Sequence, residues 1–600
     1  MGVRGLETYL ERNSKGACYK VDIKEIISRY RQETGKNPKI VIDGMSVLNH
    51  LYNKKLPWLS GGQLKEFYEV IREFIIAFIS LGAELISFFD GAPAATKRSA
   101  WIKRRLETLA DIYALFDDLA AGADPLQVQT DRKNMIPPNS GCVIMHVFHI
   151  YGCKVYKTIL ECDAEISKFA LKNDCLAILA QDSDFVIYEG AHYYWSMKNF
   201  DLDTMTTLNY DRIKLANSLR IPPQHLPLVA SLMGNDVVPY DLVMPFKKVL
   251  LRSLSRKNYV DFSTCIERVS DYVRRLPVGP AIYNYLPQIA KEVFCDESKT
   301  GLLYDSLLSY DLHTESPDIF KTGNDHWDSV LELVREHHIN GYGPACLYGI
   351  VHEQRYWGST GLEDFRINDL PPAQLVLRKL RQHIYGILLN EKPLASNQIY
   401  HEVKELVMTG PTSLESDVIV NAIPPQVEHP GLKILWNEKD RSIDNIRWSL
   451  VGEAVQISPT LIYRLPAHLI VPSLALSYLL KQGLVVSKWE IDAVLSSAIV
   501  LRELSPDNLK SLPLKIPDTR SIRLQTIFTR TYASIIILLQ VCGNPLPFDN
   551  IVATNYQDGK LFLLKYTDAK NGCSISKLCD YKVNHIETFN LITDFISAAS

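Results

Sequence analysis

Acidic residues recur along the first 240 residues at places where short apolar runs end. Asp43, Asp90 and Asp182 each follow such a run, and Asp184 comes two positions after Asp182. One aspartate after a strand is weak evidence for a site, because aspartate also caps helices and makes turns. Several at successive strand ends are harder to explain structurally, so the pattern predicts a cluster of carboxylates.

Further acids extend this pattern. Asp163 and Glu165 open an amphipathic segment, and Asp236 follows another apolar stretch. Converging carboxylates repel one another and raise one another's pKa, so a cation has to neutralise them. Oxygen ligands suit Mg²⁺ or Mn²⁺, and two ions ~4 Å apart can activate water and stabilise a leaving oxygen in phosphodiester cleavage. The candidate ligands are Asp43, Asp90, Asp163, Glu165, Asp182, Asp184 and Asp236, and two ions are expected.

A strongly basic segment follows Asp90. On a helix, residues seven positions apart share a face, so the stripe could contact nucleic-acid phosphates in a salt-dependent way. A solvated surface helix is the alternative. Trp101 in the same segment could stack on a base, although packing is the favoured interpretation. The basic residues are Lys97, Arg98, Lys103, Arg104 and Arg105.

The elements that would position these residues alternate between strands and helices. This alternation predicts βαβ units and a mostly parallel sheet, whose ligands bind beyond the carboxyl ends of the strands. Apolar residues at helical spacing from Leu64 to Phe78 predict a helix. The expected strands are 39–43, 85–89, 154–156 and 176–180, with 185–188 as a fifth candidate.

Helical patterns dominate after about residue 240, and we expect three parts: 1–245, 246–425 and a mainly helical 431–600. An amphipathic helix is predicted over 374–389, with Arg378, Lys379 and Arg381 on a face that is either solvated, the favoured interpretation, or turned to phosphate. The LxxLL sequence at 476–480 has apolar flanks, so it is expected to be a buried helix.

Composition limits the class of protein. The 600 residues are 46% hydrophobic and 22% charged, which is ordinary for a globular protein and excludes a collagen-like or wholly disordered chain. No apolar run approaches the ~18 residues of a membrane span, and the opening residues lack a signal peptide. Eleven cysteines without a CxxC indicate reduced thiols. We therefore expect an intracellular protein, nuclear or cytoplasmic or both, that is neither secreted nor membrane-bound. Its net charge of −3 means that nucleic-acid binding needs a local basic patch.

Several short motifs together resemble the flap endonuclease and xeroderma pigmentosum group G nucleases, which have a PIN-like fold. The resemblance implies that all seven acids are metal ligands and that Lys97 and Arg104 are catalytic, in a Mg²⁺-dependent structure-specific endonuclease. The sequence has Val237 where that family has tyrosine, and it lacks the Gly-Ile-Gly hairpin that grips duplex. The motifs are Val41–Met45, Phe88–Gly91, Cys162–Glu165, Gln181–Asp184 and Gly234–Asp236.

A resemblance to two relatives of those nucleases covers more of the chain. These are the Asteroid proteins and the constitutive coactivators of peroxisome proliferator-activated receptor gamma. It is carried by Gly61–Gln63, Trp101–Arg105, Leu232–Asp236 and the segment Arg381–Leu389. It implies nuclear coactivation, RNA binding and protein partners on the C-terminal half. Two hypotheses therefore stay open: an endonuclease acting on structured or single-stranded DNA or RNA, and a non-catalytic nuclear coactivator or nucleic-acid-binding protein.

Overall fold

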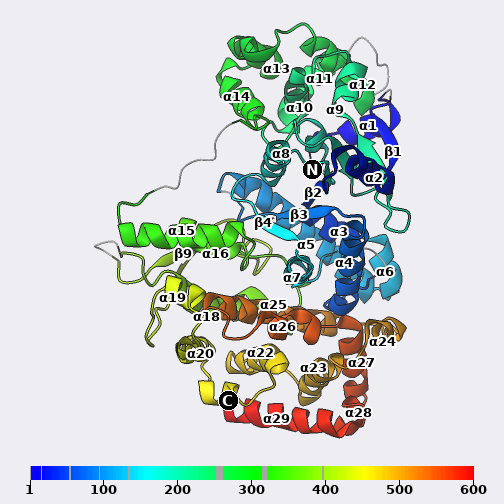
Figure 1. Ribbon diagram of the computed structural model, residues 1–600. Coiled ribbons are helices and arrows are strands. Elements are labelled where there is room, and N and C mark those ends of the chain that lie inside the picture. Colours follow the sequence, from blue (N-terminus) through cyan, green and yellow to red (C-terminus); the bar gives the residue numbers. More distant parts are fainter. Residues whose placement is uncertain are drawn as a thin grey trace. The chain divides into compact units, whose positions relative to one another are not determined.

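The computed structural model describes residues 2–14, 16–52, 56–93, 95–132, 135–251, 261–313, 321–394 and 398–599 (Figure 1). The chain forms two compact units, each built from separated stretches of sequence. The first unit comprises Met1–His50, Phe74–Asp90 and Gly152–Asp318. The second comprises Leu51–Glu73, Gly91–Tyr151 and Ile319–Ser600. The three-part division expected from the sequence remains a prediction.

The first unit is built on a seven-stranded sheet in the order β1-β7-β6-β5-β2-β3-β4. The strands from β6 to β4 are parallel, whereas β7 and β1 are antiparallel additions at one edge. The mostly parallel α/β sheet is therefore confirmed. The strands are β1 Cys18–Asp22, β2 Lys39–Asp43, β3 Glu84–Phe89, β4 Lys154–Lys157, β5 Ala177–Ala180, β6 Tyr193–Ser196 and β7 Thr206–Tyr210.

Four of the five predicted strands are present as β2, β3, β4 and β5. The fifth, at 185–188, is wrong. The chain there begins with a 3₁₀ turn, η2 (Ser183–Val186), which Asp182 caps by accepting the N–H of Asp184. The cap turns the chain immediately after β5, before a new strand can start.

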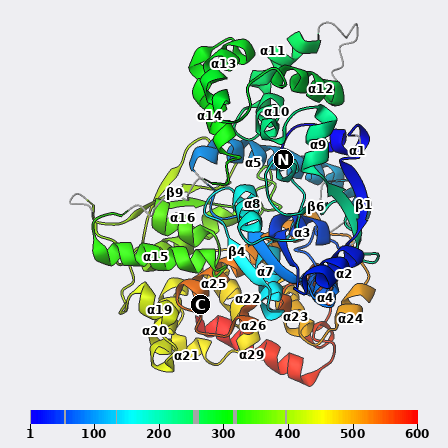
Figure 2. The same cartoon turned by 45° about the horizontal axis from the view of Figure 1, so that its top comes forward.

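The central strands are buried on both faces, since β2 from Ile40 to Asp43 and all of β5 are buried, as is typical of parallel strands with near-continuous apolar sequences. On one face, Ile166 of α8 belongs to a single core with Val41, Ile86 and Ile178 of the strands. Both views show α10 to α14 grouped together (Figures 1 and 2). The helices of this unit are α1 Leu6–Arg12, α2 Ile23–Thr34, α8 Cys162–Lys172, α9 Arg212–Leu219, α10 Leu226–Met233, α11 Tyr240–Leu251, α12 Phe262–Val273, α13 Leu286–Phe294 and α14 Thr300–Leu308.

Two helices contain residues of both units: α3 (Gly44–Leu51) and α4 (Leu64–Ile79). The predicted helix at 64–78 is thus confirmed. Within the first unit, Phe74 and Phe78 of α4 pack their rings against Phe200 at 5.7 and 5.8 Å between centroids.

The second unit is mainly helical, as predicted, but it also contains a small sheet that the sequence analysis did not anticipate. This sheet has the order β10-β9-β8, with β8 Arg355–Trp357, β9 Glu402–Leu406 and β10 Val418–Asn421. The longer helices are α5 Arg98–Ala120, α6 Pro125–Asp131, α7 Ser140–Ile150, α15 Asp325–Ile339, α16 Cys346–Glu353, α18 Arg378–Leu388, α20 Asp444–Val455, α22 Ile470–Lys481, α23 Lys488–Leu501, α25 Thr519–Val541, α27 Gly559–Lys570 and α29 Val583–Ala599.

The predicted helix at 374–389 forms as α17 (Ala373–Val376) and α18, but its predicted polar face is not solvated throughout. Arg381 is 3% exposed, and its Nε lies 2.7 Å from Oε1 of the fully buried Glu405. Arg378 binds the same carboxylate at 3.0 Å, whereas Lys379 is exposed. The solvated-face interpretation is therefore wrong for Arg381, which forms a buried ion pair.

Two other sequence features lie in helices of the second unit. The LxxLL leucines Leu476 and Leu479 are fully buried in α22, as expected of a core helix. Among the described residues, α25 is long and apolar enough to cross a membrane, but 78% of its apolar window is buried in the protein.

Candidate metal centre

The sheet brings the predicted acids of the first unit to one edge. Because β2, β3 and β5 are parallel neighbours, their carboxyl ends meet there, as in other open α/β sheets. Asp43 is the last residue of β2, Asp90 follows β3, and Asp182 follows β5 after one residue. Asp163 and Glu165 lie in the first turn of α8, where the helix dipole favours negative charge.

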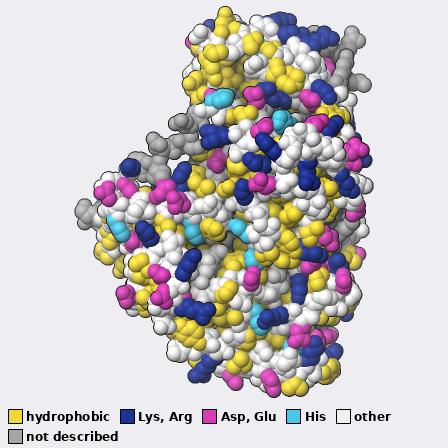
Figure 3. Space-filling view, viewed as in Figure 1, with side chains coloured by type: hydrophobic (Ala, Val, Ile, Leu, Met, Phe, Trp, Pro, Cys, Tyr) yellow, Lys and Arg dark blue, Asp and Glu magenta, His cyan; other side chains and the backbone are white. Residues whose placement is uncertain are grey.

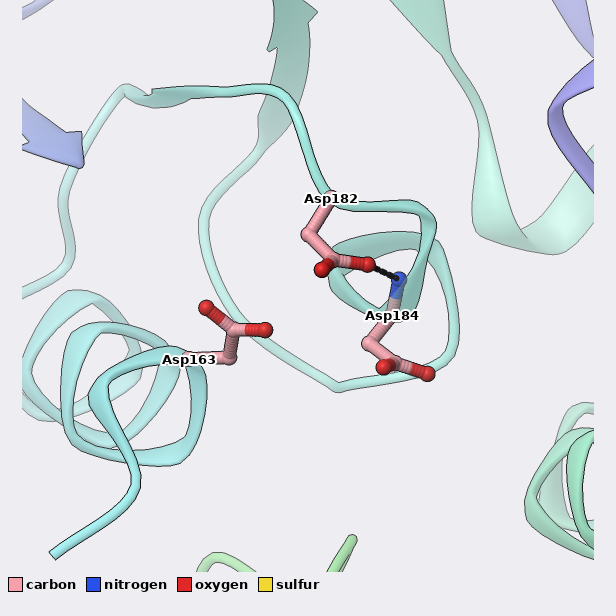
Figure 4. Close-up of side chains that lie close together, drawn as sticks. All are labelled: Asp163, Asp182 and Asp184. Atoms are coloured by element: carbon pink, nitrogen blue, oxygen red, sulfur yellow. Dashed lines mark hydrogen bonds between the residues drawn. The ribbon is translucent and has the colours of Figure 1, made fainter. Parts of the chain in front are cut away.

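Three of the seven acids form a compact cluster. Asp163, Asp182 and Asp184 each offer a carboxylate oxygen, and these oxygens lie within 4.8 Å of one another. Figure 4 shows the Asp163 carboxylate directed from α8 toward Asp182 and Asp184, which come from the turn after β5. Oδ1 of Asp182 also accepts the backbone N–H of Asp184 at 3.3 Å, which orients the Asp182 side chain.

The electrostatics of this cluster oppose full ionisation. Burial, followed by the charge of Asp182, raises the pKa of Asp184 to about 7. Burial and the charges of Asp182, Asp43, Asp184 and Asp90 hold the pKa of Asp163 well above its usual range. Like charges cannot all ionise in one small site unless a cation is bound. The donor set therefore fits a cation that prefers hard oxygen ligands, such as Mg²⁺ or Mn²⁺.

Asp43 and Asp90 lie at the same edge of the sheet, and their charges add to the effect of burial in raising the pKa of Asp163. Burial raises the pKa of Asp43 to about 6; the hydrogen bond from Ser46 acts against this rise, and the charge of Asp90 adds to it. Oδ1 of Asp43 accepts the N–H groups of Met45 at 2.9 Å and Ser46 at 3.3 Å, and its Oδ2 accepts the Ser46 hydroxyl. Asp90, in contrast, is exposed.

The other two predicted ligands lie outside the cluster of three. Oε1 of Glu165 accepts the N–H groups of Ile159 at 2.9 Å and Leu160 at 2.6 Å, so this oxygen holds the loop between β4 and α8. Asp236 is exposed beyond the end of α10, and its charge raises the pKa of Asp184. The geometry alone supports Asp163, Asp182 and Asp184 most strongly, while Glu165 and Asp236 remain predictions.

Two residues at this edge were missed by sequence reasoning. The hydroxyl of Tyr310, which follows α14, donates to Oδ1 of Asp184 at 2.7 Å. Lys157 ends β4 opposite Phe89, the residue before Asp90, and its side chain is 3% exposed. A buried ammonium requires negative neighbours, so its position beside an acidic edge is complementary in charge. Only the lysine carried a sequence signal, since it directly follows the predicted strand 154–156.

The amino-terminal segment also reaches this edge. Gly2 has a left-handed backbone, with φ of 62°, and a Cβ at this position would lie 2.0 Å from Oδ1 of Asp182. Ser183 donates its hydroxyl to the carbonyl of Val3 at 3.4 Å. The close approach of the backbone to Asp182 therefore requires glycine at position 2.

The predicted basic residues belong to the second unit. Lys97 ends a 3₁₀ turn, while Lys103 and Arg104 are exposed on α5. Arg98 forms an ion pair with Asp417 at 3.3 Å. On the face shown in Figure 3, lysine and arginine side chains are interspersed with acidic ones over most of the surface.

Arg105 of the same segment is turned toward the protein. Its guanidinium lies 5.0 Å from the ring centroid of Trp101, which is itself buried. Packing, the favoured interpretation for Trp101, is therefore confirmed.

Comparison with known proteins finds a matching domain family and similar curated proteins. The FAM120A-like domain family matches residues 219–314. A curated bovine protein (Bos taurus) named constitutive coactivator of peroxisome proliferator-activated receptor gamma is 26% identical over 680 residues, covering 100% of this chain and 95% of its own. The human protein of that name is 31% identical over 281 residues, covering 46% of this chain and 30% of its own.

The predicted resemblance to the constitutive coactivators is confirmed. With the bovine relative, the similarity runs from the acidic edge in the first unit through the helices of the second. Among solved structures, human GEN1 in complex with Holliday junction DNA is 12% identical, with a TM-score of 0.31, covering 67% of this chain and 83% of that one.

Proposed function

We propose that this protein is a divalent-cation-dependent nuclease that acts on structured or single-stranded DNA or RNA. The observation that carries the proposal is the set of three carboxylate oxygens within 4.8 Å of one another, at the carboxyl edge of a mostly parallel sheet. Their mutual repulsion destabilises the site as long as it contains only carboxylates, and a divalent cation relieves it.

In this proposal, Asp163, Asp182 and Asp184 hold one Mg²⁺ or Mn²⁺ ion. Asp43 and Asp90 would contribute to a second. Bound ions of this kind activate a water molecule and stabilise the leaving oxygen of a phosphodiester.

The surrounding residues keep the carboxylates in place. Met45 and Ser46 orient Asp43 through their backbone N–H groups, and Glu165 keeps the loop before α8 in position. The exposed Lys103 and Arg104 of α5, with Lys97, are proposed to contact phosphates of the nucleic acid.

A cleavage assay tests the proposal. Flap, bubble and single-stranded substrates of DNA and RNA are incubated with the protein in Mg²⁺, in Mn²⁺ or in a chelator. We expect cation-dependent cleavage of at least one substrate, and Asp182→Asn should reduce its rate by orders of magnitude while nucleic-acid binding persists. A parent protein that cleaves none of these substrates with either ion would contradict the enzymatic proposal.

The second candidate is a non-catalytic nuclear coactivator that uses the fold to bind nucleic acid, with protein partners on its C-terminal half. The similarity over 100% of this chain to a relative named as a coactivator favours it. A reporter assay in cells with the parent and Asp182→Asn separates the two candidates. Equal coactivation by both proteins, without cleavage by either, would favour the coactivator.

A further inference from the structure

A chain of buried and part-buried hydrogen bonds links the acidic cluster to α10 and α14. The hydroxyl proton of Tyr310 goes to Asp184 at 2.7 Å, so its oxygen is free to accept from Nδ2 of Asn235 at 3.2 Å. The same Nδ2 donates to Oγ of Ser306 at 2.9 Å. Oγ of Ser306 lies 2.7 Å from Oγ of Ser231. Tyr310 is thus the member of this network that contacts the carboxylate, and Asn235 ties its hydroxyl to Ser306 of α14 and, through it, to Ser231 of α10.

The direction of the bonds to Tyr310 and Ser306 follows from the amide of Asn235. Its Oδ1 accepts the backbone N–H groups of Val237 at 3.1 Å and Val238 at 2.8 Å. An amide oxygen cannot donate, so the NH₂ group must face Tyr310 and Ser306. Tyr310 is therefore compelled to act as a donor toward Asp184.

The ring of Tyr310 is fixed as well. It is 9% exposed and packs against the ring of Tyr188, with 5.0 Å between the centroids. The hydroxyl of Tyr188 donates to the carbonyl of Ser309, the neighbour of Tyr310, at 3.1 Å. A donor held in this way loses little conformational freedom when the carboxylate it contacts binds a ligand.

We propose that Tyr310 is a positioning residue for the cation site. It holds one oxygen of Asp184, which leaves the second oxygen directed for coordination beside Asp163 and Asp182. This inference rests on the proposed function, because it assumes that the cluster binds a cation. Outer partners that orient a metal ligand typically raise affinity 10- to 100-fold. In this chain the outer partner is Tyr310, which lies 126 residues after Asp184, near the end of the segment 219–314 that matches the FAM120A-like domain family.

Mn²⁺ binding to the whole protein tests the inference by isothermal titration calorimetry, with Tyr310→Phe as the test variant. This change removes the donor and keeps the ring that packs on Tyr188. Tyr188→Phe is the matched control, because it removes the neighbouring hydroxyl, whose bond goes to a backbone carbonyl and to none of the carboxylates. We expect Tyr310→Phe to weaken Mn²⁺ about 10- to 100-fold, while Tyr188→Phe stays close to the parent.

Two results would overturn the inference while the cation site stands. One is an unchanged affinity in Tyr310→Phe, and the other is an equal loss in both variants, which would indicate general packing. A parent protein that takes up no Mn²⁺ would overturn the proposed site together with this inference.

The melting temperatures of both apo variants show whether they fold. If Tyr310→Phe does not fold, Ser306→Ala replaces it, since it loosens Asn235 and through it Tyr310. It should weaken Mn²⁺ by a smaller factor, and no change would contradict the proposal.

Discussion

The indole rings of Trp101 and Trp357 lie 5.2 Å apart, measured between centroids. This contact anchors α5 to β8 within the second unit, and Leu406 belongs to the same small core. Trp101 therefore packs in the protein, whereas Lys103 and Arg104 remain exposed on the helix. Trp101 is therefore not available to stack on a base, and the exposed basic side chains are the candidates of α5 for nucleic-acid contact.

The first prediction concerns those side chains. Reversing Lys103 and Arg104 to glutamate should weaken nucleic-acid binding and make the plot of log affinity against log salt shallower by about 2 for duplex, since each lost phosphate contact removes about 0.9. Fluorescence anisotropy over a series of salt concentrations measures this slope. Trp101→Leu should lower the melting temperature and leave the slope unchanged. The same slope in the charge-reversed variant and the parent would refute a phosphate-binding role.

The second prediction concerns the buried carboxylate of Glu405. It accepts hydrogen bonds from Arg381 at 2.7 and 2.9 Å and from the Tyr385 hydroxyl at 2.7 Å. Glu405→Gln would leave the buried charge of Arg381 without its partner, which typically costs about 3–5 kcal/mol. Urea unfolding should show this loss in the free energy of unfolding. Glu402→Gln, an exposed change on the same strand, is the control and should stay within about 0.5 kcal/mol of the parent.

The third prediction concerns pH. Burial raises the pKa of Asp558 to about 7, and Oδ2 of this residue has no hydrogen-bond partner among the described side chains and backbone. A carboxyl whose pKa is raised in the folded state binds more protons there than in the unfolded state. It therefore stabilises the fold below about pH 4, and this contribution is lost as pH rises through about 7.

Asp558→Asn should remove this pH dependence. Asparagine keeps the cap of α27, in which Oδ1 of Asp558 accepts the Leu561 N–H at 2.8 Å, because both residues are good N-caps. The melting temperature of the variant should exceed that of the parent at pH 8 and approach it at pH 4. A constant difference at all pH values would show that Asp558 does not titrate in this range.

The fourth prediction concerns Gly2. A methyl group at this position would overlap Oδ1 of Asp182, and alanine disfavours the left-handed backbone. Gly2→Ala should therefore reduce the rise in melting temperature that Mn²⁺ produces, while the global stability of the apo protein changes little. Gly16→Ala, at another left-handed glycine with open space around its Cβ position, is the control and should preserve the Mn²⁺ effect.

The sequence could predict the central part of the first unit because β2, β3 and β5 are short apolar runs with an acid at the end of the strand or within two residues after it. It could not predict β1, β6 and β7, which lie toward one edge of the sheet and carry mixed side chains such as the Thr206–Tyr210 run. The segment 185–188 is as apolar as a strand, but the cap at Asp182 starts a 3₁₀ turn instead. Local turn chemistry there outweighed the apolar pattern.

The sequence predicted the acids that meet in the cluster, together with others, but it did not predict the residues that hold them in place. Asp163, Asp182 and Asp184 were expected at one edge from their places beside strands and helices, and their oxygens do meet there. Tyr310 gave no local signal, because only tertiary packing brings it to Asp184 across 126 positions. The buried role of Arg381 was also hidden, since its partner Glu405 lies on a strand that the sequence did not suggest.

The most direct test of the cation site is anomalous diffraction from crystals of the protein soaked in Mn²⁺. We predict an anomalous peak between the carboxylates of Asp163, Asp182 and Asp184, at about 2.0–2.3 Å from their oxygens, and its disappearance in Asp182→Asn crystals soaked in the same way. Crystals soaked at millimolar Mn²⁺ that show no peak between these carboxylates would contradict the account.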